Sequence, residues 1–416
     1  MTSISNELAA QTAERVARSS YGKLVAYLAA RNRDVASAED ALAEAFTSAL
    51  QEWPRTGPPG NPEAWLLTVA RRKQIDAARR RISGTLAAPH LHLMAEEIAA
   101  AEASATAIPD KRLALMFACA HPAIDPAVRT PLILQTVLGF DAATIASAFL
   151  VSPATMSQRL VRAKFKLKEA GIPFAIPEPA ELPRRLGAVL DAIYACFTDG
   201  WSDAEGGDSG RRDHSEEAIW LGELVVSLLP GQPEAMSLLA LMLYVESRRP
   251  ARRNAHGDYV PLSEQDPGDW IGLLIGRAEA LLFEASRLEE MGPFQVQAAI
   301  QSAHIARRIT GETDWQAIVQ LYDVLLTMTA SPVVAINRAI GVAEVRGAEA
   351  GLAALAEIST DAAIIQYQPY WAAKADLLAR CGDAAGADEA YAVAIGLEAD
   401  PAVRGFLTRR RQALRQ

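Results

Sequence analysis

Hydrophobic and polar residues alternate with the period of an α-helix through most of the first 82 residues. The hydrophobic positions that repeat at helical spacing are Leu24, Val25, Leu28, Ala38, Leu42, Ala45, Phe46 and Leu50. This spacing is typical of helices that bury one face. Residues 54–62 are rich in Pro and Gly and interrupt the pattern, and Pro62 suits the first position of a new helix that carries Trp65. Residues 5–82 are therefore predicted to form a first helical module.

A second helical module is predicted for residues 110–170, and its last part has the spacing of a helix-turn-helix core. The predicted core positions are Ile145, Ala146, Phe149, Val151, Met156 and Leu160. Ser152 can cap the second helix of this pair, and Pro153 can occupy its first turn. The side chains left facing outward are short, polar or basic, as in a helix that reads the major groove. A solvated basic helix in an ordinary helical hairpin is the alternative.

Between and after these modules the pattern changes twice. Residues 83–109 are rich in Ala and Ser and are interpreted as a linker, and residues 171–179 form a proline-rich boundary. From 182 to 416 the chain reads as amphipathic helices separated by short breakers. The last predicted helices cover 332–346, 348–358, 369–381 and 384–397. Small residues on these helices favour close packing, so the pattern resembles tetratricopeptide-like repeats, with an irregular helical bundle as the alternative.

Composition supports an all-α fold. Half of the residues are hydrophobic, Ala and Leu dominate, and no apolar run approaches the roughly 20 residues that cross a bilayer. The N-terminus lacks the pattern of a signal peptide. The three cysteines are far apart and form no CxxC pair, as expected in a reducing cytoplasm. Cys119 and His121 are interpreted as a buried thiol and a helix-end histidine rather than metal ligands.

Charge is distributed unevenly along the chain. Residues 1–175 hold 20 Lys and Arg against 16 Asp and Glu, whereas the remainder holds 21 against 34. The net charges are therefore +4 and −13, and only the first part is expected to meet a polyanion. Within it, residues 71–81 contain six cations and one acid. This composition is typical of a helix that binds a nucleic-acid backbone, or of a basic helix that is simply exposed to solvent. Residues 38–46 are acidic without bases at i+4, which suits a basic partner protein or complements the helix dipole.

Together these segments resemble bacterial RNA polymerase sigma factors of the extracytoplasmic-function class (group IV). Residues 8–82 resemble sigma region 2, a helical bundle, and residues 110–170 resemble sigma region 4, a helix-turn-helix. The phrase Ala38-Glu-Asp-Ala-Leu-Ala-Glu-Ala-Phe46 is similar to the helix that binds the polymerase clamp. Residues 61–80 resemble the segment that melts and recognises the −10 element, and residues 149–168 resemble the −35 reader.

The resemblance implies three sets of binding residues. Polymerase binding is expected at Glu39, Asp40, Glu44 and Phe46. Contacts to the −10 element are expected from Asn61, Trp65, Arg71, Arg72, Gln74, Asp76, Arg79 and Arg80. Contacts to the −35 element are expected from Ser152, Ala154, Thr155, Ser157, Gln158, Arg159, Arg162, Lys164 and Lys166, with Lys168 nearby on the basic side. Arg and Lys at such positions neutralise phosphates.

The C-terminal part resembles the long extension of one sigma subgroup, with a tetratricopeptide-like end. Phrases that match include residues 292–299, 331–339 and 369–373. Two phrases depart from the subgroup: Phe197-Thr-Asp-Gly-Trp201 stands for Phe-Asn-Glu-Gly-Tyr, and Glu264-Gln-Asp-Pro267 for Asp-Gln-Asp-Arg. These departures alter polar partners. The candidate regulatory residues of the extension are Asp199, Gly200, Trp201 and Asp266.

The resemblance implies a cytoplasmic, non-enzymatic protein that binds core RNA polymerase at its clamp and flap regions and promoter DNA. It implies no cofactor, no metal, no membrane and no separate anti-sigma protein, since the extension is thought to act in its place. Two alternatives remain. One is a stand-alone helix-turn-helix regulator with a ligand-sensing domain. The other is an enzyme, with catalytic candidates Asp199, Asp203, His214, Asp258, Asp266 and His304, although no pair has suitable spacing.

Overall fold

The computed structural model confirms the all-α fold. It describes residues 2–82, 110–149, 151–201, 209–288, 290–358 and 364–414, and within these ranges helices form the regular structure and no strand is present. The predicted linker at 83–109 and the enzyme candidate Asp203 lie outside the described residues. The chain divides into two compact units, Met1–Cys196 and Phe197–Gln416, each of which is described by itself.

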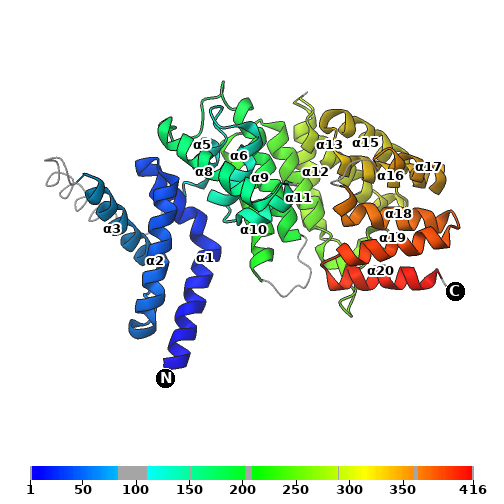
Figure 1. Cartoon of the computed structure of the whole chain (residues 1–416). Coiled ribbons are helices and arrows are strands. Elements are labelled where there is room, and N and C mark those ends of the chain that lie inside the picture. Colours follow the sequence, from blue (N-terminus) through cyan, green and yellow to red (C-terminus); the bar gives the residue numbers. More distant parts are fainter. Residues whose placement is uncertain are drawn as a thin grey trace. The chain divides into compact units, whose positions relative to one another are not determined.

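Three helices open the N-terminal unit (Figure 1): α1 (Thr2–Asn32), α2 (Val35–Thr56) and α3 (Pro62–Ile82). The structure buries most of the predicted hydrophobic stripe. Its buried residues are Leu24, Val25 and Leu28 on α1, and Ala38, Leu42 and Ala45 on α2. The prediction was wrong for Leu50, which is 51% exposed. Leu50 directly follows the buried Ala49, and a helix with 3.6 residues per turn carries neighbouring side chains to different faces.

Four further helices follow in the same unit: α5 (Arg112–Cys119), α6 (Pro126–Thr136), α7 (Ala142–Ala148) and α8 (Pro153–Glu169). The predicted cap of α8 is confirmed, since Ser152 Oγ accepts the Thr155 amide at 3.2 Å and Pro153 occupies the first turn. Asp141 caps α7 in the same way, accepting the amides of Ala143 and Thr144. These caps satisfy amides that a helix start leaves without partners, and they therefore set where α7 and α8 begin.

Most of the predicted core of the α7–α8 pair is buried, but the prediction was wrong for Phe149. Ile145, Ala146, Met156 and Leu160 are each at most 1% exposed. Phe149 is 38% exposed. It is the C-cap of α7, where the backbone leaves the helix, so the helical spacing no longer sets the direction of its ring.

Two further contacts hold the N-terminal unit together. One is a close approach of the α1 and α6 backbones, and the other is the packing of the first part of α9 (Pro183–Trp201) on α6. Gly22 of α1 lies so close to the end of α6 that an added Cβ would be 1.8 Å from the Val137 carbonyl oxygen. Only glycine fits there. Thr130 of α6 donates to the carbonyl of Ala188 on α9, and Arg129 reaches the carbonyl of Arg184. The first part of α9 therefore belongs to the N-terminal unit.

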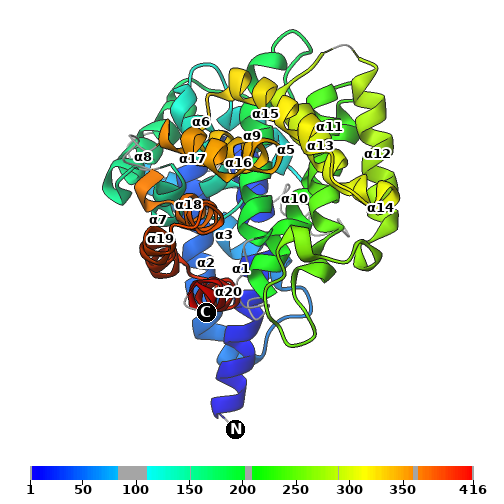
Figure 2. The same ribbon diagram turned by 90° about the vertical axis from the view of Figure 1, so that its right-hand side faces the viewer.

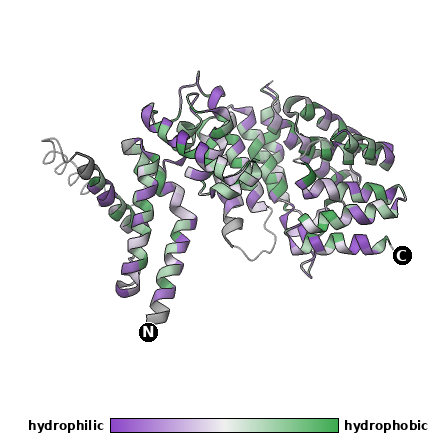
Figure 3. Cartoon of the chain, in the orientation of Figure 1, coloured by the Kyte–Doolittle hydropathy of each residue, from purple (hydrophilic) through white to green (hydrophobic). Residues whose placement is uncertain are grey.

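The C-terminal unit begins with helices around a buried central one. Its first elements are α10 (Ser209–Leu228), α11 (Pro233–Glu246), η1 (Arg249–Arg252), η2 (Leu262–Glu264), η3 (Pro267–Asp269), α12 (Gly272–Ser286), α13 (Pro293–Ile305) and α14 (Arg307–Thr310). Most of α11 is buried, and it consists largely of hydrophobic residues (Figure 3). Glu234 ties α11 to α13 by accepting the amides of Phe294 and Gln295, each at 3.0 Å.

Successive helices lie side by side through the rest of this unit (Figures 1 and 2). They are α15 (Trp315–Thr329), α16 (Pro332–Arg346), α17 (Ala348–Ala356), η4 (Ile364–Gln366), α18 (Gln368–Arg380), α19 (Ala384–Leu397) and α20 (Pro401–Ala413). The predicted helices 332–346 and 384–397 are confirmed to the residue. The predicted helix 348–358 ends two residues earlier as α17, and the predicted helix 369–381 begins and ends one residue earlier as α18. Ala339, Ala343, Ala390 and Ala394 are buried between helices, as the small-residue pattern predicted.

Candidate polymerase and nucleic-acid interface

The acidic positions of α2 follow from which face of that helix is buried. Asp34 begins the helix by accepting the Ser37 amide at 3.1 Å, and Ala38, Ala41 and Leu42 then face the core. Asp40 and Glu44 are exposed, whereas Glu39 and Phe46 are half-buried. The expected polymerase-binding residues therefore lie on the outer side of α2 and at its edge.

Two of these acids have cationic partners on other helices. Glu39 contacts Lys164 of α8 at 2.6 and 2.9 Å, and Glu44 contacts Lys73 of α3 at 3.3 Å. The sequence had shown only that no base lies one turn away on α2 itself. The partners come from segments that the tertiary structure brings alongside.

The expected −10 segment starts on a capped and aromatic-anchored helix. Asn61 Oδ1 accepts the Ala64 amide at 3.1 Å, and Trp65 packs edge to face against the buried Trp53, with ring centroids 5.4 Å apart. Trp65 itself is half-buried. Its ring is therefore held in place by Trp53 while part of it stays accessible.

Along the same helix, the cations differ in their environment. The Arg71 guanidinium lies 4.9 Å from the centre of the Tyr27 ring, whereas Arg72 and Asp76 are exposed. Gln74 is half-buried, and its Nε2 has no hydrogen-bond partner among the described side chains. The backbone of Arg79 and Arg80 belongs to α3, but their side chains lie outside the described part of the structure.

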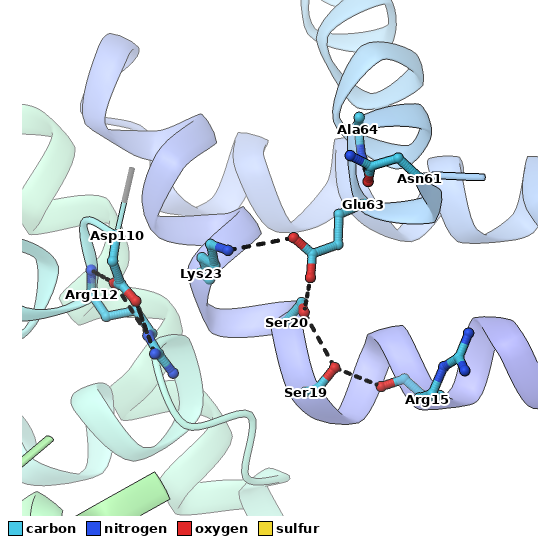
Figure 4. Close-up of polar contacts among 9 residues, drawn as sticks. All are labelled: Arg15, Ser19, Ser20, Lys23, Asn61, Glu63, Ala64, Asp110 and Arg112. Carbon is cyan, nitrogen blue, oxygen red and sulfur yellow. Dashed lines mark hydrogen bonds and ion pairs between the residues drawn. The ribbon is translucent and has the colours of Figure 1, made fainter. Parts of the chain in front are cut away.

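A polar network fixes the start of α3 against α1 (Figure 4). Glu63 reaches from α3 to accept the Ser20 hydroxyl at 2.6 Å, and its other oxygen lies 3.4 Å from Lys23 Nζ. Ser20 is 5% exposed, so this contact is shielded from water. Such a shielded contact sets the orientation of α3 more firmly than a surface ion pair would.

The expected −35 residues lie on one exposed face of α8 and on its cap. Its buried face holds Met156, Leu160, Ala163 and Leu167. The exposed predicted residues are Ser152, Ala154, Thr155, Ser157, Gln158, Arg159, Arg162 and Lys166. Lys164 differs from them, because it is half-buried and engaged with Glu39.

Helix α8 therefore lies against the start of α2. Besides the Lys164–Glu39 contact, Lys168 Nζ lies 2.6 Å from Asp34 Oδ2, and Arg33 donates to the Gly171 carbonyl at 2.9 Å. Burial raises the pKa of Glu39, and the nearby Lys164 ammonium opposes that rise. The structure thus joins part of the expected DNA-binding helix to part of the expected polymerase-binding helix.

The Cys119–His121 pair has the structural role that the sequence favoured. Cys119 is fully buried, which raises the pKa of its thiol to about 12, and it lies 3.5 Å from the Thr136 hydroxyl. His121 Nδ1 accepts the Ala123 amide at 3.1 Å. Over the described ranges, no group of three or more His, Cys, Asp or Glu is placed to hold a metal ion.

The candidate regulatory residues of the C-terminal unit have different contact partners. Asp199 contacts His214 Nδ1 at 2.9 Å, while Trp201 stacks on Phe197 at the end of α9. Asp266 instead begins η3 by accepting the Gly268 amide at 2.8 Å, and none of the contacts described for it reaches Asp199 or Trp201.

The sequence reading missed the arginines that surround Trp201. The guanidinium carbons of Arg249 and Arg252 lie 4.9 and 5.0 Å from the centre of its ring. The available signal was the run Glu246-Ser-Arg-Arg-Pro-Ala-Arg-Arg253, which places four arginines within six residues of an acidic half-chain.

Comparison with known proteins places these features in a family. Residues 16–82 match the model of sigma-70 region 2, and residues 185–286 match a family of unknown function, DUF6596. A Rhizobium meliloti (strain 1021) protein, described as uncharacterized protein R00370, is 37% identical over 390 residues. That alignment covers 93% of this chain and 91% of the rhizobial one. The chain belongs to the family of this rhizobial protein.

Within this family, the chain carries the region 2 module of the sigma-70 transcription factors at its N-terminus. The matched residues span most of α1 and all of α2 and α3. None of the solved structures matches the chain. Of the helices described, none is both long enough and apolar enough to cross a membrane.

Proposed function

We propose that the protein is a sigma factor of the extracytoplasmic-function class, which binds core RNA polymerase and directs initiation at specific promoters without catalysis of its own. The observation that carries this proposal is the sigma-70 region 2 match, because it covers both the acidic helix α2 and the basic helix α3. The exposed polar and basic face of α8 supports it independently.

The roles divide along the chain. Residues 5–82 bind the polymerase clamp through α2 and the −10 strand through α3. Residues 110–170 act as region 4, with α7 and α8 as a helix-turn-helix that reads the −35 duplex and contacts the polymerase flap. Residues 83–109 tether the two, which allows both to engage spaced DNA elements at once. Arg159 and Arg162 read or neutralise DNA, since both are exposed cations on α8.

The C-terminal part, residues 182–416, is proposed to regulate initiation in cis through its tetratricopeptide-like helices, in place of a separate anti-sigma protein. It carries the excess of acid, so it suits screening of basic surfaces or binding to polymerase rather than binding to DNA. The protein acts in the cytoplasm, where its polymerase partner is found.

The test is run-off transcription with core polymerase and full-length protein, using two variants, each with a control. Asp40→Lys should weaken core binding about tenfold or more, whereas Glu52→Lys, an exposed acid further along α2, should not. The double variant Arg159→Gln, Arg162→Gln should lower promoter affinity about tenfold or more. Its control is Arg184→Gln, an exposed cation outside α8.

The outcome separates the proposal from its main rival. No initiation at any promoter with the wild-type protein would contradict the proposal. Tight, specific binding of duplex DNA without polymerase would instead favour a stand-alone helix-turn-helix regulator. A truncated version for the same assay should end at Cys196 rather than near Pro177, because residues 183–196 belong to the N-terminal unit.

A further inference from the structure

Arg248, in the C-terminal unit, is a buried cation that has no acidic partner among the described residues. It lies between α11 and η1, next to Ser247, the C-cap of α11, and it is only 7% exposed. Its Nη2 donates to Gln301 Oε1 of α13 at 2.5 Å, while its Nη1 is buried and has no hydrogen-bond partner among the described residues. A buried guanidinium N–H without an acceptor is costly, so it calls for an explanation.

A second guanidinium nearby has the same feature. Arg307, at the start of α14, lies over the Trp270 ring with its guanidinium carbon 5.0 Å from the ring centre. Its Nη2 donates to the carbonyls of Leu262 and Gln265 at 2.8 and 2.7 Å. Its Nε is buried and has no hydrogen-bond partner in the part of the chain that the structure describes. Each arginine therefore keeps one buried donor unused.

The charges around Arg248 leave it uncompensated. Burial, together with the like charge of Arg307, lowers the pKa of Arg248 to about 10, so it stays protonated at neutral pH. The other groups that act on it are the phenols of Tyr322 and Tyr259. Burial and the two arginines lower the pKa of His304 to about 4, so its imidazole is neutral. Among the described residues, no carboxylate is paired with either of the two cations.

The acids close to this arginine run are committed to other partners. Glu246 pairs with Arg249 at 2.6 Å. Asp400 pairs with Arg253 at 3.0 Å and accepts the Ala402 amide at the start of α20. Of the four arginines in the run Arg248–Arg253, Arg249 and Arg253 pair with carboxylates, Arg252 donates to the Trp201 carbonyl, and Arg248 donates to Gln301.

We infer that Arg248 and Arg307 bind the oxyanion group, carboxylate or phosphate, of a small-molecule ligand. Two guanidinium donors in a shielded setting suit the oxygens of such a group, and its negative charge compensates the unpaired cations. Trp270 beneath Arg307, and Trp315 packed edge to face on His304 with centroids 5.4 Å apart, supply the aromatic surroundings typical of ligand sites. The inference stands whether or not the protein is a sigma factor.

The experiment measures binding to the full-length protein without transcription. Thermal unfolding and titration calorimetry are run with inorganic phosphate, with acetate, and with chloride at equal ionic strength. The variants are Arg248→Met and Arg248→Lys. The control is Arg308→Gln, an exposed cation next to Arg307 that removes charge without reaching the buried donors. Because phosphate stabilises proteins generally, only differences between variants count.

Phosphate or acetate is expected to bind the wild type and Arg308→Gln alike, and to bind the Arg248 variants about tenfold to a hundredfold more weakly. In chloride, Arg248→Met should melt no lower than the wild type, because it removes an unpaired buried charge. Binding of phosphate alone assigns a phosphate ester, and binding of acetate alone assigns a carboxylate. If Arg248→Met fails to fold, Arg248→Lys decides.

Three results would overturn the inference. One is the absence of any wild-type response to phosphate or acetate beyond that to chloride. Another is a response of Arg248→Lys equal to that of the wild type. The third is a folded Arg248→Met that melts well below the wild type in chloride, which would mean that Arg248 serves the fold alone.

Discussion

Lys164 Nζ lies 2.9 and 2.6 Å from the two carboxylate oxygens of Glu39, so one ammonium group spans both. The two side chains are only 12% and 17% exposed. Under the proposed function, Lys164 belongs to the helix that faces DNA and Glu39 to the helix that faces polymerase. For that proposed function, the pair has to open before either residue can meet its partner.

The strength of the Lys164–Glu39 ion pair is measurable by a double-mutant cycle. Replacing Lys164 and Glu39 by Ala, singly and together, should give a coupling free energy of about 1 kcal/mol, because the pair is shielded from solvent. Urea unfolding of the full-length protein measures it. The matched control is the exposed pair Arg18–Glu14 on α1, at 2.6 Å, whose coupling should be smaller. Equal coupling in the two cycles would contradict the prediction.

Gly22→Ala should disturb the packing of α1 against α6 in the N-terminal unit without changing the charge of the protein. A Cβ at Gly22 would lie 1.8 Å from the Val137 carbonyl oxygen, so Gly22→Ala must push α1 away from the end of α6. We expect a loss of about 1–3 kcal/mol in the free energy of unfolding. Gly187→Ala, in α9 with open space around its Cβ, should be neutral or slightly stabilising. Two variants of equal stability would rule out the close approach.

His304 should make the stability of the C-terminal unit fall in acid. Its folded pKa of about 4 lies below the ordinary value of 6.5, so the unfolded chain binds the proton more tightly. The stability that depends on neutral His304 is present above pH 6.5 and is lost as the pH falls toward 4. The expected loss is about 3 kcal/mol. Urea unfolding across this range should give a shallower pH dependence for His304→Gln, and parallel curves would refute the assignment.

Glu234 should stabilise the C-terminal unit by capping a helix other than its own. Its carboxylate accepts two amides at the start of α13, so Glu234→Ala should cost about 1–2 kcal/mol, measured by urea unfolding. Glu234→Gln keeps one acceptor oxygen and should lose less. The exposed Glu312→Ala serves as control. A loss no larger than that of the control would show that the cap contributes little.

Local features of this protein were predictable from the sequence. Helical periodicity and breakers located α16 and α19 to the residue, and the Ser152-Pro153 pair marked the start of α8. Each depends on residues within one or two helical turns, whose hydrogen bonds and packing are set by sequence spacing. The failures at Leu50 and Phe149 occurred where a residue stood at the edge of a stripe or at a helix end.

The tertiary structure alone decided which faces meet. Lys164 and Glu39 are 125 residues apart, and their contact depends on how α8 packs against α2, which no periodicity encodes. The same holds for Arg248 and Arg307. In the sequence they are ordinary cations, and only the structure distinguishes them from the arginines that have carboxylate partners among the described residues. The sequence by itself determined the helices, their caps and the excess of acid in the second half. The pairing of charges came from packing, because the energy of an ion depends on surroundings that distant segments supply.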